Sequence, residues 1–219
     1  MELVVYTTVF GRTKPLNEPR TESQARFVCF TDQPLQSERW EIVRVEPLAA
    51  PNRESRRYKH LSHWALPDAD ASLWIDSNFA LRVDPAVIAE RHPDPITTFH
   101  HPERTRISTE AQAIIRHAKA IPEAVLAQLA AYQADGFDTD ADPQQRLSAG
   151  GFILRRHGEQ VRRFNDFWHH QAQTWTLRDQ MSIDYSAWKT GVRIEHFPGT
   201  HRNTPYADFI RMQVPINDF

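Results

Sequence analysis

A carboxylate and an amide stand two residues apart at the end of an apolar run. The run over residues 73–75 (Leu-Trp-Ile) predicts a short buried strand, and Asp76-Ser77-Asn78 follows it directly. Because alternate residues of an extended chain point the same way, Asp76 and Asn78 can reach one ligand. Ligands of open α/β sheets bind beyond the carboxyl ends of strands, and these oxygens with those of a diphosphate suit Mg²⁺ or Mn²⁺. The alternative interpretation is a plain Asp/Asn turn.

A second carboxylate, Asp179, stands between Arg178 and Gln180, where a helix is expected to begin. In this polar setting it could bind sugar hydroxyls, or act as a base or a nucleophile. The alternative is a structural role, because aspartate is a preferred helix N-cap.

Cationic side chains precede the Asp76 strand. Arg56, Lys59 and His63 are spaced i, i+3 and i+7, so a helix over 55–66 would carry them on one face. Such a face could meet the diphosphate of a nucleotide, and the alternative is a solvated basic surface.

The segment 195–202 combines two histidines and an arginine with a Pro-Gly turn after an expected strand. A neutral imidazole such as His196 can bind a divalent metal, and Arg202 can hold phosphate oxygens. The alternative for His196 is a hydrogen-bonded histidine of the core.

Composition excludes several classes of protein. The 219 residues are 40% hydrophobic and 25% charged, with a formal net charge of -2, so the chain can bury one large core but has no basic footprint for nucleic acid. The single cysteine, Cys29, excludes an internal disulfide framework and a four-cysteine zinc site. The absence of a G-x-G-x-x-G or Walker A sequence disfavours dinucleotide enzymes and P-loop ATPases.

The sequence pattern predicts neither a membrane span nor a signal peptide. No apolar run approaches the roughly 18 residues that cross a membrane. The first six residues, Met-Glu-Leu-Val-Val-Tyr, lack the basic region of a signal peptide. We therefore expect no transmembrane segment and a cytoplasmic location.

Hydrophobic periodicity predicts alternating strands and helices. Strands are expected at 3–9, 26–31, 40–45, 71–75, 95–99, 151–154 and 192–197, and helices at 55–66, 85–91, 107–118, from 122, at 161–175 and at 181–189. Residues 47–52 and 133–145 are expected to be loops. This alternation is typical of an α/β sheet with helices on both faces. No linker divides the chain, so one domain is expected, with the tail from residue 200 wrapping back over the sheet.

Taken together, these segments resemble the nucleotide-diphosphosugar glycosyltransferases of the GT-A fold. The most similar family was once catalogued only as a domain of unknown function, and plant proteins of cell-wall and mucilage formation typify it. Its ordered motifs correspond here to Cys29-Phe30-Thr31-Asp32, Ser55-Arg56-Arg57-Tyr58-Lys59, Trp74-Ile75-Asp76-Ser77-Asn78, His101-Pro102-Glu103-Arg104 and Arg178-Asp179-Gln180-Met181-Ser182.

A weaker resemblance is to the glycogenin-type retaining transferases. Their Asn-Ala-Gly strand is similar to Ser148-Ala149-Gly150, and their metal-binding His-[Phe/Tyr]-x-Gly is similar to His196-Phe197-Pro198-Gly199. Asn78 departs from the second aspartate of the usual Asp-x-Asp, and Thr204-Pro205-Tyr206 from the usual Lys-Pro-Trp.

The resemblance implies a mixed GT-A-like sheet in one domain over 1–219, with a donor half at 1–99 and an acceptor half with a C-terminal wrap at 100–219. It implies transfer of a sugar from a nucleoside diphosphate donor to a saccharide or glycan, assisted by Mn²⁺ or Mg²⁺. The resemblance is compatible both with retention and with inversion of the anomeric configuration. The implied donor-binding residues are Tyr6, Thr7, Thr8, Asp32, Arg56, Lys59 and Arg202. Metal ligands would be Asp76, Asn78 and His196; sugar or acceptor contacts Gly150, Gly151, Arg178 and Gln180; and the catalytic carboxylate Asp179.

Two rival hypotheses remain. A non-catalytic carbohydrate- or nucleotide-binding module could keep the same fold, and Asn78 favours it. A nucleotidyltransferase on a similar sheet would want a glycine-rich phosphate loop, which does not follow the first strand.

Overall fold

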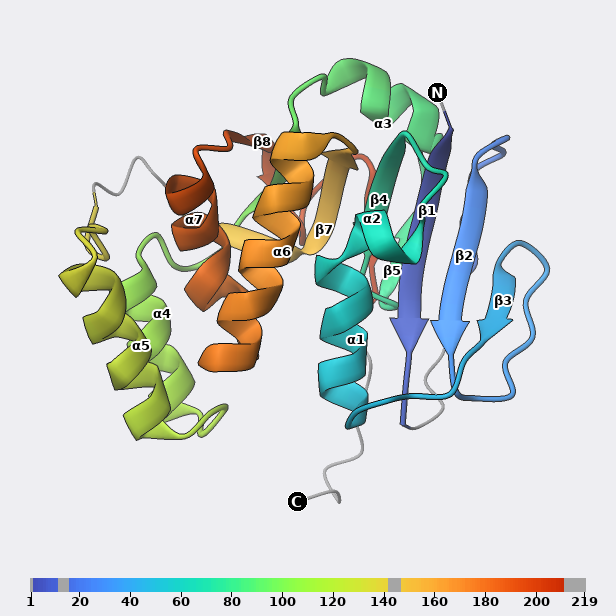
Figure 1. The fold of residues 1–219 in the computed structure, drawn as a ribbon. Coiled ribbons are helices and arrows are strands. Elements are labelled where there is room, and N and C mark those ends of the chain that lie inside the picture. The colour runs from blue at the N-terminus through green and yellow to red at the C-terminus, as the bar shows by residue number, and fades with distance from the viewer. Residues whose placement is uncertain (1, 12–15, 142–146, 211–219) are drawn as a thin grey trace.

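A single mixed sheet organises the chain, with its strands in the order β3-β2-β1-β4-β7-β6-β8 (Figure 1). The computed structural model describes residues 2–11, 16–141 and 147–210. Neighbours β3, β2, β1 and β4 are parallel, β7 runs antiparallel to β4 and β6, and β8 is parallel to β6. The strands are β1 Leu3–Val9, β2 Arg26–Thr31, β3 Glu41–Arg44, β4 Ala71–Ile75, β6 Ile96–His100, β7 Ser148–Arg156 and β8 Ile194–Thr200.

Two short strands that the sequence analysis did not predict form a second sheet. β5 (Phe79–Leu81) begins just after Asn78 and pairs antiparallel with β9 (Ala207–Phe209). At three residues each, they are too short to give a clear hydrophobic period. Their pairing brings the segment 207–209 back beside the turn that follows β4.

Helices cover both faces of the large sheet, as the alternation predicted. On one face, α1, α6 and α7 pack side by side (Figure 1), and on the other α3 packs against β1. The helices of the described residues are α1 Pro51–His60, α2 Ser62–Ala65, α3 Pro85–Arg91, α4 Ile107–Arg116, α5 Pro122–Ala134, α6 Glu159–Thr174 and α7 Asp179–Thr190. The α/β class and the mixed sheet are thus confirmed, and the arrangement is consistent with a GT-A-like fold.

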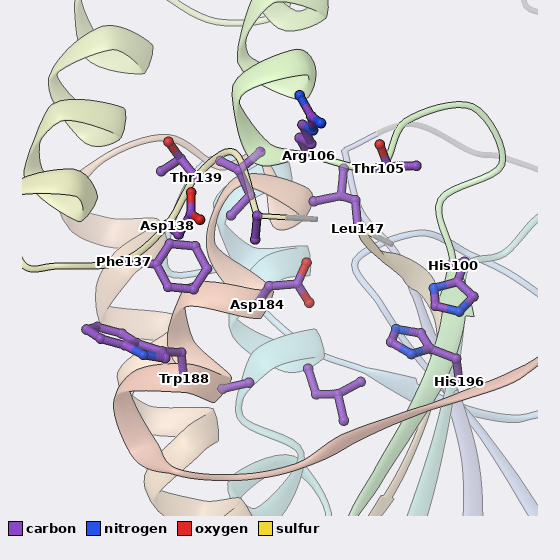
Figure 2. A pocket seen from close by; sticks show the side chains of 14 residues that line it. His100, Thr105, Arg106, Phe137, Asp138, Thr139, Leu147, Asp184, Trp188 and His196 are labelled. Atoms are coloured by element: carbon purple, nitrogen blue, oxygen red, sulfur yellow. The ribbon is translucent and has the colours of Figure 1, made fainter. Parts of the chain in front are cut away.

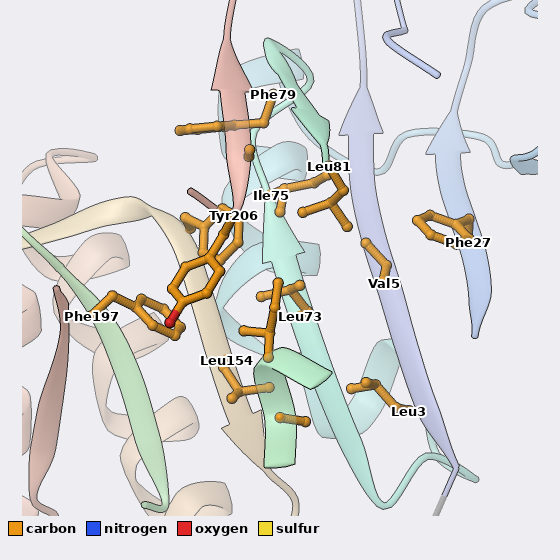
Figure 3. Packing of buried hydrophobic residues seen from close by; sticks show 14 of the residues in the cluster. Leu3, Val5, Phe27, Leu73, Ile75, Phe79, Leu81, Leu154, Phe197 and Tyr206 are labelled. Atoms are coloured by element: carbon orange, nitrogen blue, oxygen red, sulfur yellow. The ribbon is translucent and has the colours of Figure 1, made fainter. Parts of the chain in front are cut away.

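The core divides according to the pleat of the strands. Leu3 and Val5 of β1 point to the α3 side, where Leu73, Phe197 and Tyr206 join them (Figure 3). Val4 and Tyr6 point to the opposite side and pack in the layer of α1, α6 and α7. This alternation is the period of two that an extended strand imposes, and burial on both faces explains why β1 is apolar throughout.

Several predicted element boundaries were wrong. β7 begins at Ser148 rather than at Gly151, and β8 continues to Thr200, so the expected Pro198-Gly199 turn lies within this strand. The first helix begins at Pro51, not at Ser55, because proline is favoured at the first helical position. It ends at His60, because Leu61 leaves the helical region with ψ 55 and separates α1 from α2. His63 therefore does not continue the face of Arg56 and Lys59, and pairs with Asp166 instead. The loop expected at 133–145 begins later, because α5 continues to Ala134, and part of it lies outside the described residues.

Candidate active site

Three basic side chains of α1 surround the carboxylate of Asp179 at the start of α7. Lys59 Nζ lies 2.5 Å from Asp179 Oδ2, while Arg56 Nε lies 3.0 Å and His60 Nε2 3.1 Å from Oδ1. The side chain of Asp179 is 5% exposed and that of Lys59 is 2% exposed. The helix dipole adds a favourable positive end beside the carboxylate. Asp179 is thus the centre of a buried ion cluster.

The N-cap interpretation of Asp179 was wrong. Asp179 is the first helical residue, Arg178 occupies the cap position, and no side chain caps this helix end. Physically, the positive charges on α1 attract the carboxylate more strongly than a backbone N–H of its own helix does.

Asp179 is ionised throughout the ordinary pH range. Burial alone would raise its pKa, but the charges of Arg56 and Lys59 and the hydrogen bond from His60 overcome this and hold the pKa well below its usual value. Burial lowers the pKa of His60 to about 4, so His60 is neutral at pH 7. In the tautomer with a proton on Nε2 it donates to Asp179. A carboxylate with so low a pKa is a fixed negative charge and a weak base.

Asp76 lies next to this cluster, at the end of β4. Its Oδ1 accepts a hydrogen bond of 2.9 Å from Trp74 Nε1 and lies 3.6 Å from Lys59 Nζ. Lys59 therefore bridges two carboxylates, one buried and one 45% exposed. The prediction that Lys59 faces a diphosphate from an open helix face differs from this placement, because α1 packs against β1 and α6 and Lys59 is buried between Asp179 and Asp76.

Two glycines of β7 allow the carboxylates to approach the strand. A Cβ at Gly150 would lie 2.9 Å from Asp179 Cβ, and one at Gly151 would lie 3.1 Å from Asp76 Oδ2. The predicted sugar-contact residues Gly150 and Gly151 thus lie directly against the two acidic side chains. A larger residue at Gly150 would require backbone or Asp179 to shift.

A buried arginine donates hydrogen bonds to the last turn of α1. Arg155 donates to the carbonyl oxygens of Lys59 (2.6 Å) and His60 (3.0 Å), and to Asn165 Oδ1 and the hydroxyl of Tyr6. A cation at a helix C-terminus opposes the negative end of the helix dipole. Arg155 therefore fixes the turn of α1 that carries Lys59 and His60.

Of the first-strand residues assigned to the nucleoside, Thr8 lines a cavity. Tyr6 and Thr7 are fully buried, and the hydroxyl of Tyr6 donates to the carbonyl of Lys59. Asp32, at the end of β2, accepts hydrogen bonds from the backbone N–H of Gly11 and from Gln33 Nε2. Asp32 thus anchors the chain that leaves β1, and among the described residues it does not line the cavity that Thr8 lines.

A cavity of about 230 Å³ lies beyond the carboxyl ends of β1 and β4, and we refer to it as the strand-end pocket. Thr8, Arg56, Asp76 and Asn78 line it together, as the sequence predicted for the donor side. Asn78 Oδ1 is buried and has no hydrogen-bond partner among the described residues. An unsatisfied buried oxygen is costly, so this atom is suited to a ligand.

His196 lies elsewhere. Its Nε2 is 3.0 Å from Ser148 Oγ, its ring stacks on His100 with centroids 3.7 Å apart, and burial lowers its pKa to about 4. Three strand spacings separate β8 from β4 in the sheet, roughly 14 Å. The structure therefore does not bring His196 to Asp76, and within the described part of the chain no three His, Cys, Asp or Glu side chains are grouped to hold a metal.

The remaining predicted residues do not line the strand-end pocket. Arg202 is exposed and pairs with Glu103. Arg178 lines a cavity of about 340 Å³ with Arg56, and Gln180 is partly buried at the second position of α7. The ring of His201 lies against those of Phe79 and Phe209, and the charges of Arg202 and Asp76 both act on it.

Sequence reasoning missed three residues of this site. His201 was noted but given no role, although the charge of Asp76 acts on it. His60 shares a helix face with Arg56 through i, i+4 spacing, which the predicted helix over 55–66 already contained but which was not used. Arg155 carried no signal, because a charged residue in an apolar strand says nothing about its partners.

Comparison with known proteins adds a family. A family model described as TOD1/MUCI70, glycosyltransferase-like domain, matches residues 1–204. A relative from Arabidopsis thaliana, named probable hexosyltransferase MUCI70, is 27% identical over 210 residues, which cover 83% of this chain and 36% of the relative. The chain thus spans about a third of that relative's length. None of the helices described here has the length and apolar character that a membrane span requires.

Proposed function

This chain belongs to the TOD1/MUCI70 glycosyltransferase-like domain family, and from that premise we propose that it transfers a hexosyl group from a nucleoside diphosphate sugar to a saccharide. The similarity to a probable hexosyltransferase supports the class of sugar. The observation that carries the proposal is the strand-end pocket, where Asp76, Asn78 and Arg56 converge beyond β4 beside the buried Asp179.

The residues of the strand-end pocket fit Mg²⁺ or Mn²⁺. Asn78 Oδ1 is an acceptor without a partner among the described residues, and Asp76 Oδ1 takes the contacts from Trp74 and Lys59, which leaves Oδ2 for a ligand. Both are hard oxygen donors of the kind these ions prefer, and donor phosphates would complete the shell. When bound, the ion neutralises charge on the departing diphosphate.

The protein's own residues supply charge and position. In the reaction the bond between the anomeric carbon and the diphosphate breaks, and a bond to the acceptor oxygen forms. Asp179, fixed as an anion, would stabilise the positive charge that develops at the anomeric carbon, or would accept a hydrogen bond from a sugar hydroxyl. Lys59 holds Asp179 and Asp76 in register, and Arg56 spans the distance from Asp179 to the pocket.

A second candidate function is a binding module without turnover. Asn78, in place of a second aspartate, favours it because a neutral amide binds a divalent cation less strongly than a carboxylate does. Such a module would bind a carbohydrate or a nucleotide, and only the transferase predicts turnover of a nucleotide sugar.

We expect UDP or GDP with Mn²⁺ to raise the melting temperature. A ligand at a hundredfold excess over its Kd stabilises the native state by about 2.7 kcal/mol, which corresponds to about 5–10 °C for a chain of this size. Differential scanning fluorimetry with each nucleotide, with and without metal, measures the shift. Asn78→Ala should reduce it, while Asp208→Asn, on an exposed ion pair with Arg20, should not. An unchanged melting temperature with both nucleotides, each tested with Mn²⁺ and with Mg²⁺, would contradict the donor site.

A further inference from the structure

A second cavity, of about 390 Å³, lies between α7, the loop 137–141 and the ends of β6 and β8 (Figure 2). We refer to it as the Trp188 pocket. Apart from His196, none of its lining residues had a predicted role. The side chains that give it its chemistry are Trp188, Phe137, Asp138, Asp184, His100 and His196.

Aromatic rings form one wall of the Trp188 pocket. Trp188 is 47% exposed, and its ring lies 5.4 Å from that of Phe137, at 59°. The stacked rings of His100 and His196 stand on the opposite side (Figure 2). A large aromatic surface left open to solvent beside a cavity is a platform on which the apolar face of a flat ligand can stack.

A carboxylate projects into the space between these walls. Figure 2 shows Asp184 pointing from α7 into the cavity, between Leu147 and the histidines. Its Oδ2 accepts the backbone N–H of Ser148 at 3.0 Å, and burial raises its pKa. A desolvated carboxyl group gains from further hydrogen-bond donors, and a hydroxyl group supplies one without adding charge.

The charges in the Trp188 pocket favour an uncharged, hydroxylated ligand. Asp184 and Asp138 oppose a phosphate, since Arg106 is the single arginine or lysine among the lining residues that the structure describes. At neutral pH His196 is uncharged, because burial lowers its pKa to about 4. Aromatic rings for an apolar face, together with a few acceptors and donors for hydroxyls, match a sugar ring.

Two rigid elements, α7 and β7, run from the Trp188 pocket to the buried ion cluster around Asp179. Asp184 follows Asp179 by five residues on α7, a rise of about 7.5 Å. Ser148 precedes Gly150 by two residues on β7, about 7 Å along the same face. A short saccharide in the pocket could therefore extend to the site of Asp179.

We propose that the Trp188 pocket binds the acceptor saccharide, with Trp188 stacking on one sugar ring and Asp184 accepting hydrogen bonds from the hydroxyl groups of that sugar. This inference rests on the proposed transferase function. Saccharide binding in this pocket can nevertheless be tested separately, because it requires neither a bound donor nor turnover.

We expect Trp188→Ala to weaken saccharide binding by about tenfold or more, the size of one lost stacking contact. The probe is a panel of neutral tetrasaccharides, tested one by one on the full chain by saturation-transfer NMR and calorimetry. Trp188→Phe should restore most of the affinity, since it keeps an aromatic ring. Asp184→Asn should also weaken binding, since an amide is a poorer acceptor.

Trp64→Ala is the matched control, because Trp64 is 43% exposed and contacts Tyr58 and Arg57 rather than this cavity. Melting temperatures and UDP and GDP binding are measured on the same samples. Saccharide affinity lost in Trp188→Ala with nucleotide binding intact supports the proposal. Equal loss in Trp64→Ala, no loss in Trp188→Ala, or no saccharide binding by a chain that binds nucleotide overturns it and leaves the donor site standing. If the chain binds neither probe, the proposed function falls as well.

Discussion

Asp179→Asn is expected to lower the free energy of unfolding by about 3–5 kcal/mol, the usual cost of removing one partner from a buried ion pair. The substitution leaves Lys59, 2% exposed, without its nearest counter-ion, and Asp76 at 3.6 Å compensates only in part. It also removes a fixed negative charge from the proposed reaction centre. We therefore expect sugar transfer to fall by about a hundredfold or more even in the molecules that remain folded.

Denaturant unfolding and transfer assays below the transition measure both effects. Asp208→Asn is the control, since its ion pairs with Arg20 and Arg82 lie at the surface and should each contribute about 1 kcal/mol or less. If Asp179→Asn unfolds within about 1 kcal/mol of the unmodified chain, the buried ion cluster does not stabilise the fold as described.

Asp76→Asn should separate chemistry from stability. The side chain is 45% exposed, and an asparagine oxygen could still accept the hydrogen bond from Trp74, so the melting temperature should change little. Loss of its charge should reduce the metal-dependent turnover of donor by about a hundredfold or more, the scale of removing one electrostatic contact from a reaction centre.

The comparison uses saturating nucleotide sugar over a range of Mn²⁺ concentrations. An expected companion effect is a higher metal requirement, because an amide replaces a carboxylate ligand. Turnover equal to that of the unmodified chain, at the same metal concentration, would remove Asp76 and the strand-end pocket from the reaction.

The parts of the fold that depend on local pattern could be predicted from the sequence. The apolar runs of β1 and β4 are recognisable because both faces of these strands are buried. Asp76 and Asn78 were expected to share one ligand as alternate residues of an extended chain. They line one cavity, but through a turn, which the hydrogen bond from the Phe79 N–H to the Asp76 carbonyl closes; the turn interpretation of this segment is therefore correct.

The parts that depend on long-range pairing could not. Periodicity does not say that β7 and β6 stand between β4 and β8, so the distance between Asp76 and His196 was not available from the sequence. The same limit hid the role of Asp179. Its helical position was nearly correct, but its partners come from a helix about 120 residues earlier.

Lys59 illustrates a different difficulty. A cation on a helix is usually solvated, and its spacing from Arg56 says nothing about which side of the helix is covered. Burial of Lys59 follows from the packing of α1 against β1 and α6. Two nearby carboxylates offset the cost of desolvating its charge.

The most direct test of the central claim is release of nucleoside diphosphate from a nucleotide sugar. The purified chain is incubated with UDP- and GDP-linked hexoses and Mn²⁺, with and without the saccharides that it binds, and product is measured by mass spectrometry. The proposed function predicts slow hydrolysis of at least one donor, faster turnover when an acceptor is present, and loss of both in Asp76→Asn. Tight binding of nucleotide and saccharide with no turnover of any donor would contradict it, and would identify a binding module on a transferase fold.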